Sequence, residues 1–505
     1  MQLRPYQVDL VNRTREAFRR SRRVCMQLST GGGKTPTASY MVNAIQQRGK
    51  RIWWLAHKDF LVEQASDKLR SFGIRHGIVS SGHFPDPRHT VLVCSIGTMR
   101  NRFAAMPAPD WIVTDECHHA ASPTWAKLLG SFPDAYQLGL TATPERPDGQ
   151  GLDPFYDELV CGASASELME WNRIHPREGL CPYHIISAKT VSAEGVRHTK
   201  SHEFNMEDLG ELMADKKIQG DAVTEYERLP KPGIKFCTFA PTVKVSMDME
   251  REYRDRGHAV MHLDGTMDKT VIRRAIKDYA RGELKGVISR DILLEGLDLQ
   301  GVGAVQWLRH TESLVVFKQG NGRGWRPDTD EVFFMDHVGN FGQMVNGEWV
   351  PKHGLPDRDH EWSLQGRKAR EEKEKTITYW ECGRCHAKNE MERAFCRDCK
   401  HARPVRNRKE IEIDASVQLE VIDVEAIRRE DRMAQGSFRT VDDFVKHGRS
   451  HGFANHVLIA REEKARLRSE VRKKAVDTGD LDTIREFMGW KPKALKAYLA
   501  AGEEA

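Results

Sequence analysis

The sequence predicts an α/β protein with two parallel-sheet domains in series, followed by a small cysteine cluster and a helical carboxyl-terminal region. Its 505 residues, at about 150 residues per domain, suggest about three or four domains. Up to about residue 340, short apolar runs alternate with charged amphipathic stretches. Four of the ten cysteines then lie close together, between residues 382 and 399. The alternation predicts the fold class, and the cysteines predict a separate small unit.

The first 165 residues contain apolar runs that are typical of strands. Each run is bounded by turn residues or by a charged segment typical of an amphipathic helix. The runs cover residues 22–30, 51–57, 89–96, 110–116 and 135–143. Strands that alternate with helices form parallel sheets through βαβ units. We therefore predict a first α/β domain over residues 1–165.

The same pattern returns after residue 230 and predicts a second α/β domain over residues 166–365. Its strand-like runs cover residues 233–240, 258–265, 284–291, 302–310 and 330–337. The stretch 161–230 joins the two domains, and the pattern does not fix the boundary within it. Beyond residue 365 the composition becomes highly charged, which is typical of a helical linker over residues 366–375. We expect a four-cysteine zinc finger at 376–404 and short helices over 405–505.

Composition excludes several classes of protein. Lys and Arg together number 78 and Asp and Glu 73, so the net charge of +5 does not by itself point to nucleic acid. No apolar run approaches the roughly 20 residues that a membrane helix needs. The first ten residues, MQLRPYQVDL, lack the hydrophobic core of a secretory signal. We expect a cytoplasmic protein that does not engage a membrane.

A glycine-rich segment, STGGGKT (29–35), follows one strand-like run and opens a helix-like stretch. This is the context of a phosphate-binding loop, because glycines let backbone N–H groups turn toward an anion at a helix amino terminus. Lys34 would place positive charge on the β- and γ-phosphates, and Thr35 would offer a hydroxyl to Mg²⁺. The strict pattern has glycine where Leu28 stands. The alternative is a glycine-rich turn followed by an exposed lysine. The predicted nucleotide-binding residues here are Thr30, Gly31, Gly32, Gly33, Lys34 and Thr35.

An acidic pair, Asp115 and Glu116, ends the apolar run that begins at Trp111. Parallel sheets bind ligands at the carboxyl ends of their strands, so both carboxylates would lie at the ligand edge. Asp115 would hold Mg²⁺, and Glu116 would orient and activate the attacking water. The alternative is an acidic helix cap. A zinc site built from His118 and His119 is disfavoured, because adjacent residues rarely converge on one metal.

Together these motifs resemble those of superfamily 2 helicases and translocases, over residues 3 to 340. The matching segments are LRPYQ (3–7), STGGGKT (29–35), LAHKDFLVEQ (55–64), SIGTM (95–99), DECHH (115–119), LTATPERPDGQGL (140–152), SRDILLEGLDLQGV (289–302) and QGNGRGWRP (319–327). They occur in the family's order. Leu28 is common in the restriction-motor branch of the family, whereas Ser29 replaces its usual proline.

The resemblance implies two RecA-like domains with ATP and Mg²⁺ between them. It implies that Arg4 and Gln7 contact the nucleotide, Gln7 through its base, and that Gly296 and Asp298 line the cleft between the domains. It also implies that Thr141 and Thr143 relay the state of the γ-phosphate between the domains. Arg323 and Arg326 are three residues apart, so on a helix they would share one face and reach the γ-phosphate as arginine fingers. The predicted catalytic residues are Lys34, Asp115, Glu116, Gln319, Arg323 and Arg326.

ATP hydrolysis would then drive movement along a nucleic acid or its unwinding. Contacts to the strand would be mostly to phosphates, and Thr98 and Arg100 are candidates in the first domain. Lys318 is a weaker candidate in the second domain. DNA is favoured as partner, and RNA stays possible through the zinc finger. The alternatives are a motor subunit of a restriction system and an ATP-switched clamp that does not unwind. Replication, recombination or restriction proteins are expected partners. The segment 440–453 resembles phage-encoded helicases, which implies a bacterial or phage-infected cell.

The clustered cysteines have the spacing of a four-thiolate zinc site, with Cys382, Cys385, Cys396 and Cys399 as ligands. The alternative is a pair of redox dithiols. Together with Trp380 and Asn389 they resemble the Ran-binding-protein type of zinc finger, which binds single-stranded RNA or ubiquitin. His386 and Ala387 disfavour ubiquitin. The resemblance implies nucleic-acid contacts by Trp380, Arg384 and Asn389, and a purely structural zinc knuckle is the alternative.

Overall fold

The computed structural model describes two parallel-sheet domains and parts of the segments that follow them. The described residues are 2–57, 59–81, 88–146, 149–187, 206–213, 216–294, 297, 299–345, 348–358, 360, 362–365, 379–381, 388–390, 399, 420–425 and 427–428. Residues Met1–Val424 form one compact unit that contains both sheets, and Glu425–Ala505 form a second unit. Within the described residues, no helix is long and apolar enough to cross a membrane.

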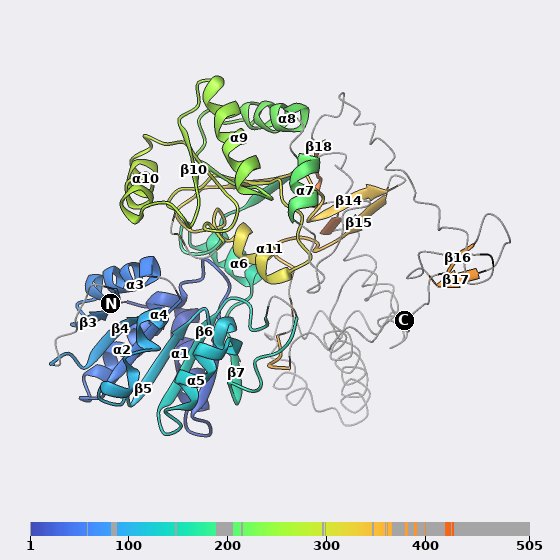
Figure 1. Ribbon diagram of the computed structural model, residues 1–505. Coiled ribbons are helices and arrows are strands. Elements are labelled where there is room, and N and C mark those ends of the chain that lie inside the picture. The colour runs from blue at the N-terminus through green and yellow to red at the C-terminus, as the bar shows by residue number, and fades with distance from the viewer. Residues whose placement is uncertain are drawn as a thin grey trace, which may run out of the picture. The chain divides into compact units, whose positions relative to one another are not determined.

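The first domain is a seven-stranded parallel sheet of order β3-β4-β2-β5-β6-β1-β7 (Figure 1). Its elements are α1 (Pro5–Ala17), β1 (Arg23–Gln27), α2 (Lys34–Gln46), β2 (Ile52–Ala56), α3 (Asp59–Ser71), β3 (Gly77–Val79), β4 (Val91–Ser95), α4 (Ile96–Met99), the 3₁₀ turns η1 (Phe103–Ala105) and η2 (Cys117–Ala121), β5 (Trp111–Asp115), α5 (Pro123–Gly130), β6 (Tyr136–Thr141) and β7 (Glu158–Cys161).

Strand β2 shows why this sheet is covered on both faces. All five of its residues are buried, as expected for a continuous apolar run in a parallel sheet. Successive side chains of a strand point to opposite faces. Accordingly Trp54 packs in one core with Leu10 of α1, whereas Trp53 packs in the other with Trp125 of α5. The apolar runs therefore form a central sheet between two layers.

The second domain has a sheet of order β10-β11-β9-β12-β13-β8-β18, in which only β18 is antiparallel to its neighbour among the described strands. Its elements, with the preceding α6, are α6 (Ala165–Ile174), β8 (Tyr183–Ser187), α7 (Met206–Met213), α8 (Lys216–Glu227), β9 (Phe236–Phe239), α9 (Val243–Asp255), β10 (Val260–Leu263), α10 (Lys269–Arg281), β11 (Gly286–Ser289), β12 (Ala304–Trp307), α11 (Leu314–Asn321), β13 (Val332–Asp336), β14 (Gly342–Val345), β15 (Glu348–Pro351) and β18 (Glu420–Val421). Strands β14 and β15 form a separate antiparallel pair.

Each apolar run predicted from the sequence contains one strand of the two sheets, so the predicted α/β class with two parallel sheets is confirmed. The carboxyl-terminal segments are described only in part. Strands β16 (Tyr379–Glu381) and β17 (Lys388–Glu390) pair antiparallel within the predicted zinc finger. The predicted linker 366–375 and most of 405–505 lie outside the described residues, where the helical region stays a prediction.

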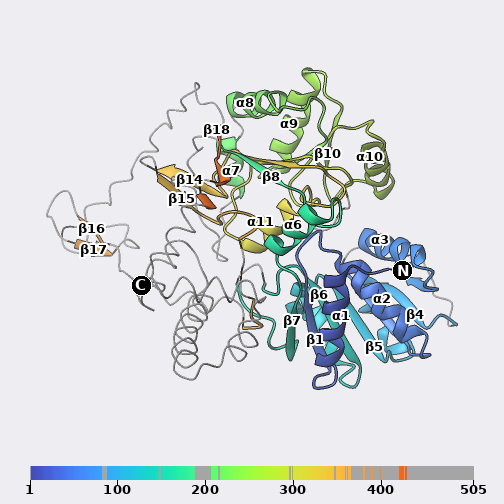
Figure 2. The same ribbon diagram turned by 180° about the vertical axis from the view of Figure 1, so that it is seen from behind.

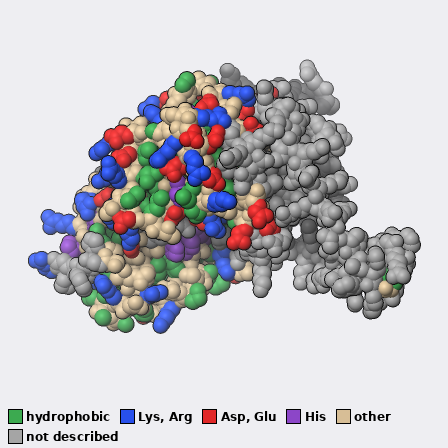
Figure 3. Space-filling model, turned by 45° about the horizontal axis from the view of Figure 1, so that its top comes forward, with side chains coloured by type: hydrophobic (Ala, Val, Ile, Leu, Met, Phe, Trp, Pro, Cys, Tyr) green, Lys and Arg blue, Asp and Glu red, His purple; other side chains and the backbone are tan. Residues whose placement is uncertain are grey.

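Charge is mixed on the face of the molecule that Figure 3 shows. Figure 3 shows positive and negative side chains interspersed on the face in view. This agrees with the small net charge of +5. Any attraction to a polynucleotide must therefore come from local groups and not from the field of the whole protein.

Candidate nucleotide-binding and catalytic site

The segment STGGGKT forms a loop between β1 and α2, at the carboxyl edge of the first sheet. Gly31 and Gly33 have φ angles of 83° and 91°, a region that favours glycine. A Cβ atom at Gly33 would lie 2.3 Å from the Nε2 atom of Gln7. The loop therefore needs glycine here both for its backbone angles and for space, as a phosphate-binding loop does.

The one departure from the strict phosphate-loop pattern has a packing explanation. Leu28 is fully buried beneath the loop. Its Cγ atom lies 2.9 Å from the position that a Cβ at Gly32 would take, and Leu168 of α6 lies 3.0 Å from the same position. Leu28 thus packs under the loop, where the strict pattern has glycine.

The amino-terminal motif lies directly against this loop. Gln7 donates its Nε2 hydrogen to the Gly32 carbonyl at 3.0 Å and accepts the Arg4 backbone N–H at 3.0 Å. Tyr6 donates its hydroxyl to the same Gly32 carbonyl at 3.1 Å. Arg4 in turn donates to the Tyr6 hydroxyl at 3.1 Å. The structure therefore brings both predicted residues to the phosphate loop. Our sequence reasoning missed Tyr6, although an aromatic residue next to Gln7 was a visible signal.

The acidic pair lies at the carboxyl end of β5. Asp115 is its last residue, and Glu116 follows with φ 48° and ψ 57°, a left-handed conformation that costs a residue with a side chain roughly 1 kcal/mol. The Asp115 carboxylate accepts the Glu116 backbone N–H at 3.1 Å. Strain at a non-glycine residue that carries a carboxylate is typical of a functional position.

Burial and neighbouring charges shift the pKa values of the two carboxylates in opposite directions. Burial, with the neighbouring charge of Glu116, raises the pKa of Asp115 to about 7. Burial also acts to raise the pKa of Glu116, but nearby positive charges outweigh it and lower this pKa. The largest of these comes from Lys34, and Arg323 of the second domain also contributes. Glu116 is therefore kept ionised, which a group that accepts a proton from water requires.

A polar chain connects the acidic pair to the end of β6. The Nδ1 atom of His118 lies 3.4 Å from the Glu116 carboxylate and 3.4 Å from the Thr141 hydroxyl. Thr141 donates its hydroxyl to the Thr143 carbonyl at 2.9 Å and accepts the Thr143 N–H at 3.1 Å. Burial lowers the pKa of His118, so its ring is neutral in this chain of contacts. The sequence predicted the two threonines as a relay but not the part of His118.

The arginine-bearing motif of the second domain differs from its prediction. Helix α11 ends at Asn321 and its C-cap is Gly322, so Arg323 and Arg326 lie in the following turn and do not share a helix face. The prediction of a helix was wrong because the sequence GNGRG places glycines at 320, 322 and 324, which favour a turn. Gln319 lies within α11.

This turn, residues 322–326, is called the arginine turn or the Gly322 turn below. It contacts the phosphate loop of the first domain. A Cβ atom at Gly322 would lie 2.2 Å from the Thr30 Cγ2 atom. A Cβ atom at Gly31 would lie 2.7 Å from the Trp325 carbonyl oxygen. Glycine is therefore needed on both sides of the contact, because any side chain would separate the two loops.

Arg323 is held within its own domain and lies within electrostatic range of Glu116. It is 6% exposed, and its two terminal nitrogens donate to the Leu297 and Leu294 carbonyls, each at 3.1 Å. Its charge contributes to the lowered pKa of Glu116. Arg326 donates from Nε to the Gly322 carbonyl at 3.2 Å. The structure thus brings Lys34, Glu116 and Arg323 into one electrostatic cluster.

Several predicted residues lie elsewhere or outside the described part. Gly296 and Asp298 are not among the described residues, nor are Arg384 and the thiols Cys382, Cys385 and Cys396. Thr98 is in α4, and Arg100 follows it with an exposed side chain. Trp380 and Asn389 lie opposite each other in the β16–β17 pair. Within the described residues, no group of His, Cys, Asp and Glu is placed to hold a metal ion, so the zinc ligands stay a prediction.

Comparisons with known proteins agree with this geometry. Residues 1–146 match the family described as type III restriction enzyme, res subunit, and residues 221–328 match the helicase conserved C-terminal domain. The chain carries the motor domains of a superfamily 2 helicase or translocase. Motor domains of this type hydrolyse ATP, and the chain is accordingly an ATP hydrolase.

Individual relatives place these motor domains near restriction enzymes and a phage protein. A 51.5 kDa protein of a Lactococcus phage is 25% identical over 80% of this chain and 83% of its own length. The type I restriction enzyme EcoAI endonuclease subunit of Escherichia coli is 26% identical over 64% of this chain. The matched region covers only 44% of that subunit. A fragment of a putative HsdR subunit of a type I restriction enzyme from Vibrio vulnificus has the same fold, with a TM-score of 0.50 and 20% identity over 66% of this chain and 63% of the fragment.

Proposed function

We propose that this protein is a nucleic-acid-dependent ATPase that moves along or unwinds DNA, with its nucleotide held between the two motor domains. The observation that carries the proposal is the contact between the phosphate loop and the Gly322 turn, which brings Arg323 into the electrostatic surroundings of Glu116. Phosphoryl transfer requires a base or a water-orienting group on one side of the γ-phosphate and positive charge around it. Each domain supplies part of this set.

Within the site, Lys34 would contact the β- and γ-phosphates and the Tyr6–Gln7 pair would support the loop. Glu116, kept ionised by its neighbours, would orient the attacking water and take its proton. Arg323 would stabilise the charge that develops on the transferred phosphoryl group. Gln319, in α11, and Arg326, in the turn that follows it, would complete the second domain's contribution.

Magnesium fits the donors that the site offers. Asp115 is a partly buried carboxyl whose pKa is raised to about 7, so a nearby cation would favour its ionised form. Thr35 follows Lys34 at the start of α2. We infer that Thr35 and Asp115 would hold Mg²⁺, which neutralises phosphate charge when bound. Gly296 and Asp298, as the family resemblance implies, would line the same cleft.

Coupling to a polynucleotide would use the opening and closing of the two domains. The loss of the γ-phosphate would weaken the link between the phosphate loop and the Gly322 turn and let the domains part. Thr98 and Arg100 lie at the carboxyl end of β4, where they can contact a strand's phosphates. The restriction-subunit relatives favour DNA as the track, and the phage relative supports action in the cytoplasm of a bacterial or phage-infected cell.

The carboxyl-terminal cysteines would hold one zinc ion in a small nucleic-acid-binding finger. The β16–β17 pairing supports this, because it brackets the positions of Cys382 and Cys385 as the two strands of a knuckle would. Cys396 and Cys399 would complete the ligand set. Trp380 and Asn389 are opposed on the hairpin, and with Arg384 they would contact bases, with RNA as a possible ligand.

The experiment is steady-state ATP hydrolysis by the full chain with matched single- and double-stranded DNA and RNA. We expect stimulation by at least one DNA form, and a higher DNA concentration for half-stimulation in Arg100→Ala, because a phosphate contact is lost. Arg70→Ala is the matched control, since this exposed arginine pairs with Asp67 on α3.

A motor subunit of a restriction system would behave in the same way and would need partner subunits to cleave DNA. ATP binding without turnover in every condition would contradict the proposal and favour a clamp.

A further inference from the structure

The chain returns from the second domain to the first after β15. We call residues 355–365 the return segment; its described residues are 355–358, 360 and 362–365. Just before it, the Gly354 N–H donates to the Phe341 carbonyl at 2.9 Å, which holds this point to the second domain. Near its other end, Leu364 is 8% exposed and belongs to the core of the first domain with Trp53 and Trp125. The segment therefore links the two domains a second time.

The first-domain anchor is made by backbone as well as side chain. The Leu364 carbonyl accepts the N–H groups of Leu152 at 2.6 Å and Asp153 at 3.0 Å. A Cβ atom at Gly151 would lie 2.0 Å from the same carbonyl oxygen. Leu152 and Asp153 lie just after the LTATPERPDGQ stretch that begins with the Thr141 relay. The anchor thus joins the segment to the stretch of the first domain that follows Thr141 and Thr143 in the sequence.

The second-domain anchor is a lysine on the helix that leads to the arginine turn. Lys318 donates from Nζ to the Pro356 carbonyl at 2.8 Å and to the Arg358 carbonyl at 3.2 Å. The Tyr183 hydroxyl donates to the Asp357 carboxylate at 2.6 Å. Hydrogen bonds from a charged donor are among the stronger ones. Lys318 was a candidate for a nucleic-acid contact in the sequence, but these bonds direct it to the return segment.

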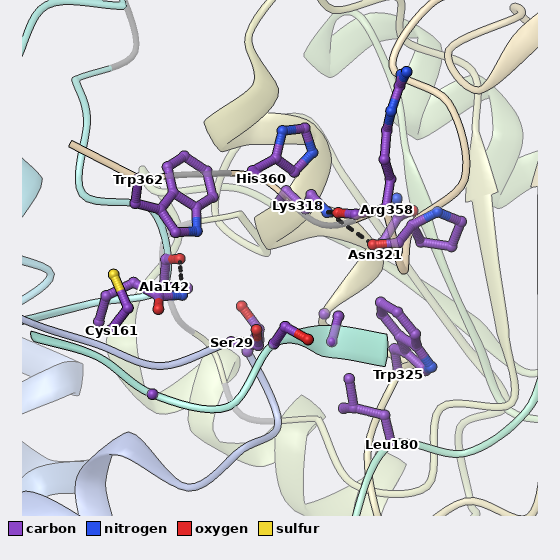
Figure 4. Close-up of a pocket in the computed structure, with 17 residues that line it drawn as sticks. Ser29, Ala142, Cys161, Leu180, Lys318, Asn321, Trp325, Arg358, His360 and Trp362 are labelled. Atoms are coloured by element: carbon purple, nitrogen blue, oxygen red, sulfur yellow. Dashed lines mark hydrogen bonds between the residues drawn. The ribbon is translucent and has the colours of Figure 1, made fainter. Parts of the chain in front are cut away.

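Between its two anchors the return segment spans a cavity of about 360 Å³. The cavity is lined by Ser29 and Thr30 of the phosphate loop and by Arg358, His360 and Trp362 of the return segment. Figure 4 shows Ser29 on one side and these three return-segment residues on the other. Lys318 thus holds the segment to the second domain, and Leu364 holds it to the first.

We propose that the return segment is a tether that holds the Gly322–Arg323 turn against the phosphate loop, with Lys318 and Leu364 as positioning residues for ATP hydrolysis. Helix α11 carries Lys318 four residues before Gly322, so the position of the tether is passed directly to the turn. Release of either anchor lets Arg323 drift from Glu116. Turnover then falls while the first domain keeps its own nucleotide contacts. This inference rests on the proposed role of Arg323.

Amide hydrogen exchange tests the tether without any enzymatic activity. Lys318→Met keeps most of the side chain but removes its donors. We expect the Leu152 and Asp153 amides, in the other domain, to exchange about tenfold faster in this variant, the size expected from the loss of a charge-assisted hydrogen bond. The control is Lys277→Met, an exposed lysine of α10, which should leave both amides unchanged. Unchanged exchange of these amides in Lys318→Met would overturn the tether.

Turnover tests the positioning role. Lys318→Met and Leu364→Ala should each lower the kcat of ATP hydrolysis about tenfold, and the double variant should lose little more, because both act through one segment. Thermal melting of Lys318→Met should match the wild type, which separates positioning from unfolding. A kcat unchanged in Lys318→Met, or full additivity of the two substitutions, would overturn the role. A wild-type chain without ATPase activity would instead contradict the proposed function, while the exchange result still reports on the tether.

Discussion

At the scale of single residues, the site depends on glycines that let two loops meet and on one carboxylate held in its ionised form. The backbone of Glu116 has a strained left-handed conformation, and positively charged neighbours lower the pKa of its carboxylate. Gly322 has no space for a side chain beside Thr30. The geometry therefore requires the two domains to be in contact for the catalytic groups to assemble.

Gly322→Ala tests that requirement. The added Cβ would lie 2.2 Å from Thr30 Cγ2, so the turn must move away from the phosphate loop. We expect the kcat of ATP hydrolysis to fall about tenfold or more, as a displacement of catalytic groups by about 1 Å predicts. Gly130→Ala is the control, because a Cβ there meets nothing within 4 Å. A Gly322→Ala enzyme with wild-type kcat would contradict the required contact.

The sequence predicted the positions of the proposed site residues better than their local structure. Lys34 begins α2, Asp115 ends β5 and Glu116 follows it, as the order of the motifs predicts. The arginine turn was wrongly placed on a helix because three-residue spacing was weighed above the glycines around it. The contacts of Tyr6 with Gly32 and of Thr30 with Gly322 could not be predicted, because they join residues far apart in sequence.

At the scale of elements, two helices from different domains form ion pairs with matched spacing. Lys269 of α10 binds Asp59 of α3 at 2.6 Å, and Arg273 pairs with Glu63. Both helices carry their charges four residues apart, so the pairs lie side by side. Figures 1 and 2 both show α3 and α10 next to each other. These ion pairs favour the arrangement in which α3 of the first domain lies against α10 of the second.

Charge reversal tests whether these ion pairs matter. Because the side chains are partly exposed, we expect Glu63→Arg to reduce kcat/KM for ATP by only about twofold to fivefold at low salt. Arg273→Glu added to it should restore the value, and about 0.5 M salt should remove the difference by screening. The control is Arg274→Glu, at an 85% exposed side chain of the same helix. A double reversal no better than the single one would argue against the pairs.

The predicted zinc finger can be tested by its metal content. A segment as short as 376–404 cannot bury a large core and would need the metal to fold. We expect one zinc per chain in the purified protein and loss of that zinc in Cys396→Ser. Cys161→Ser, a partly buried cysteine of β7, should keep it. Elemental analysis measures both. Stoichiometric zinc in Cys396→Ser would count against the four-thiolate site.

Strand prediction succeeded where the apolar runs were long and failed where pairing was short or distant. β2 and β5 are buried central strands with continuous apolar sequence. β3 has three residues, and β18 has two that join a strand more than 230 positions earlier in the chain. Such pairing depends on tertiary contacts that a local pattern does not contain.

At the scale of the whole molecule, we propose one ATPase site to which both domains contribute. The phosphate loop, the acidic pair and the amino-terminal motif come from the first domain, and the arginine turn comes from the second. The return segment adds a second connection between them. We expect a bound polynucleotide to shift the equilibrium between open and closed arrangements of the two domains.

The most direct test of this account is the rate of ATP hydrolysis by Glu116→Gln. The substitution keeps shape and removes the group that accepts a proton, so we expect kcat to fall at least about 100-fold, with ATP still bound. Glu283→Gln, at a 61% exposed side chain, should hydrolyse ATP normally. The account predicts a Glu116→Gln chain that binds ATP and does not turn it over, with or without DNA. Hydrolysis by Glu116→Gln at the wild-type rate would contradict it.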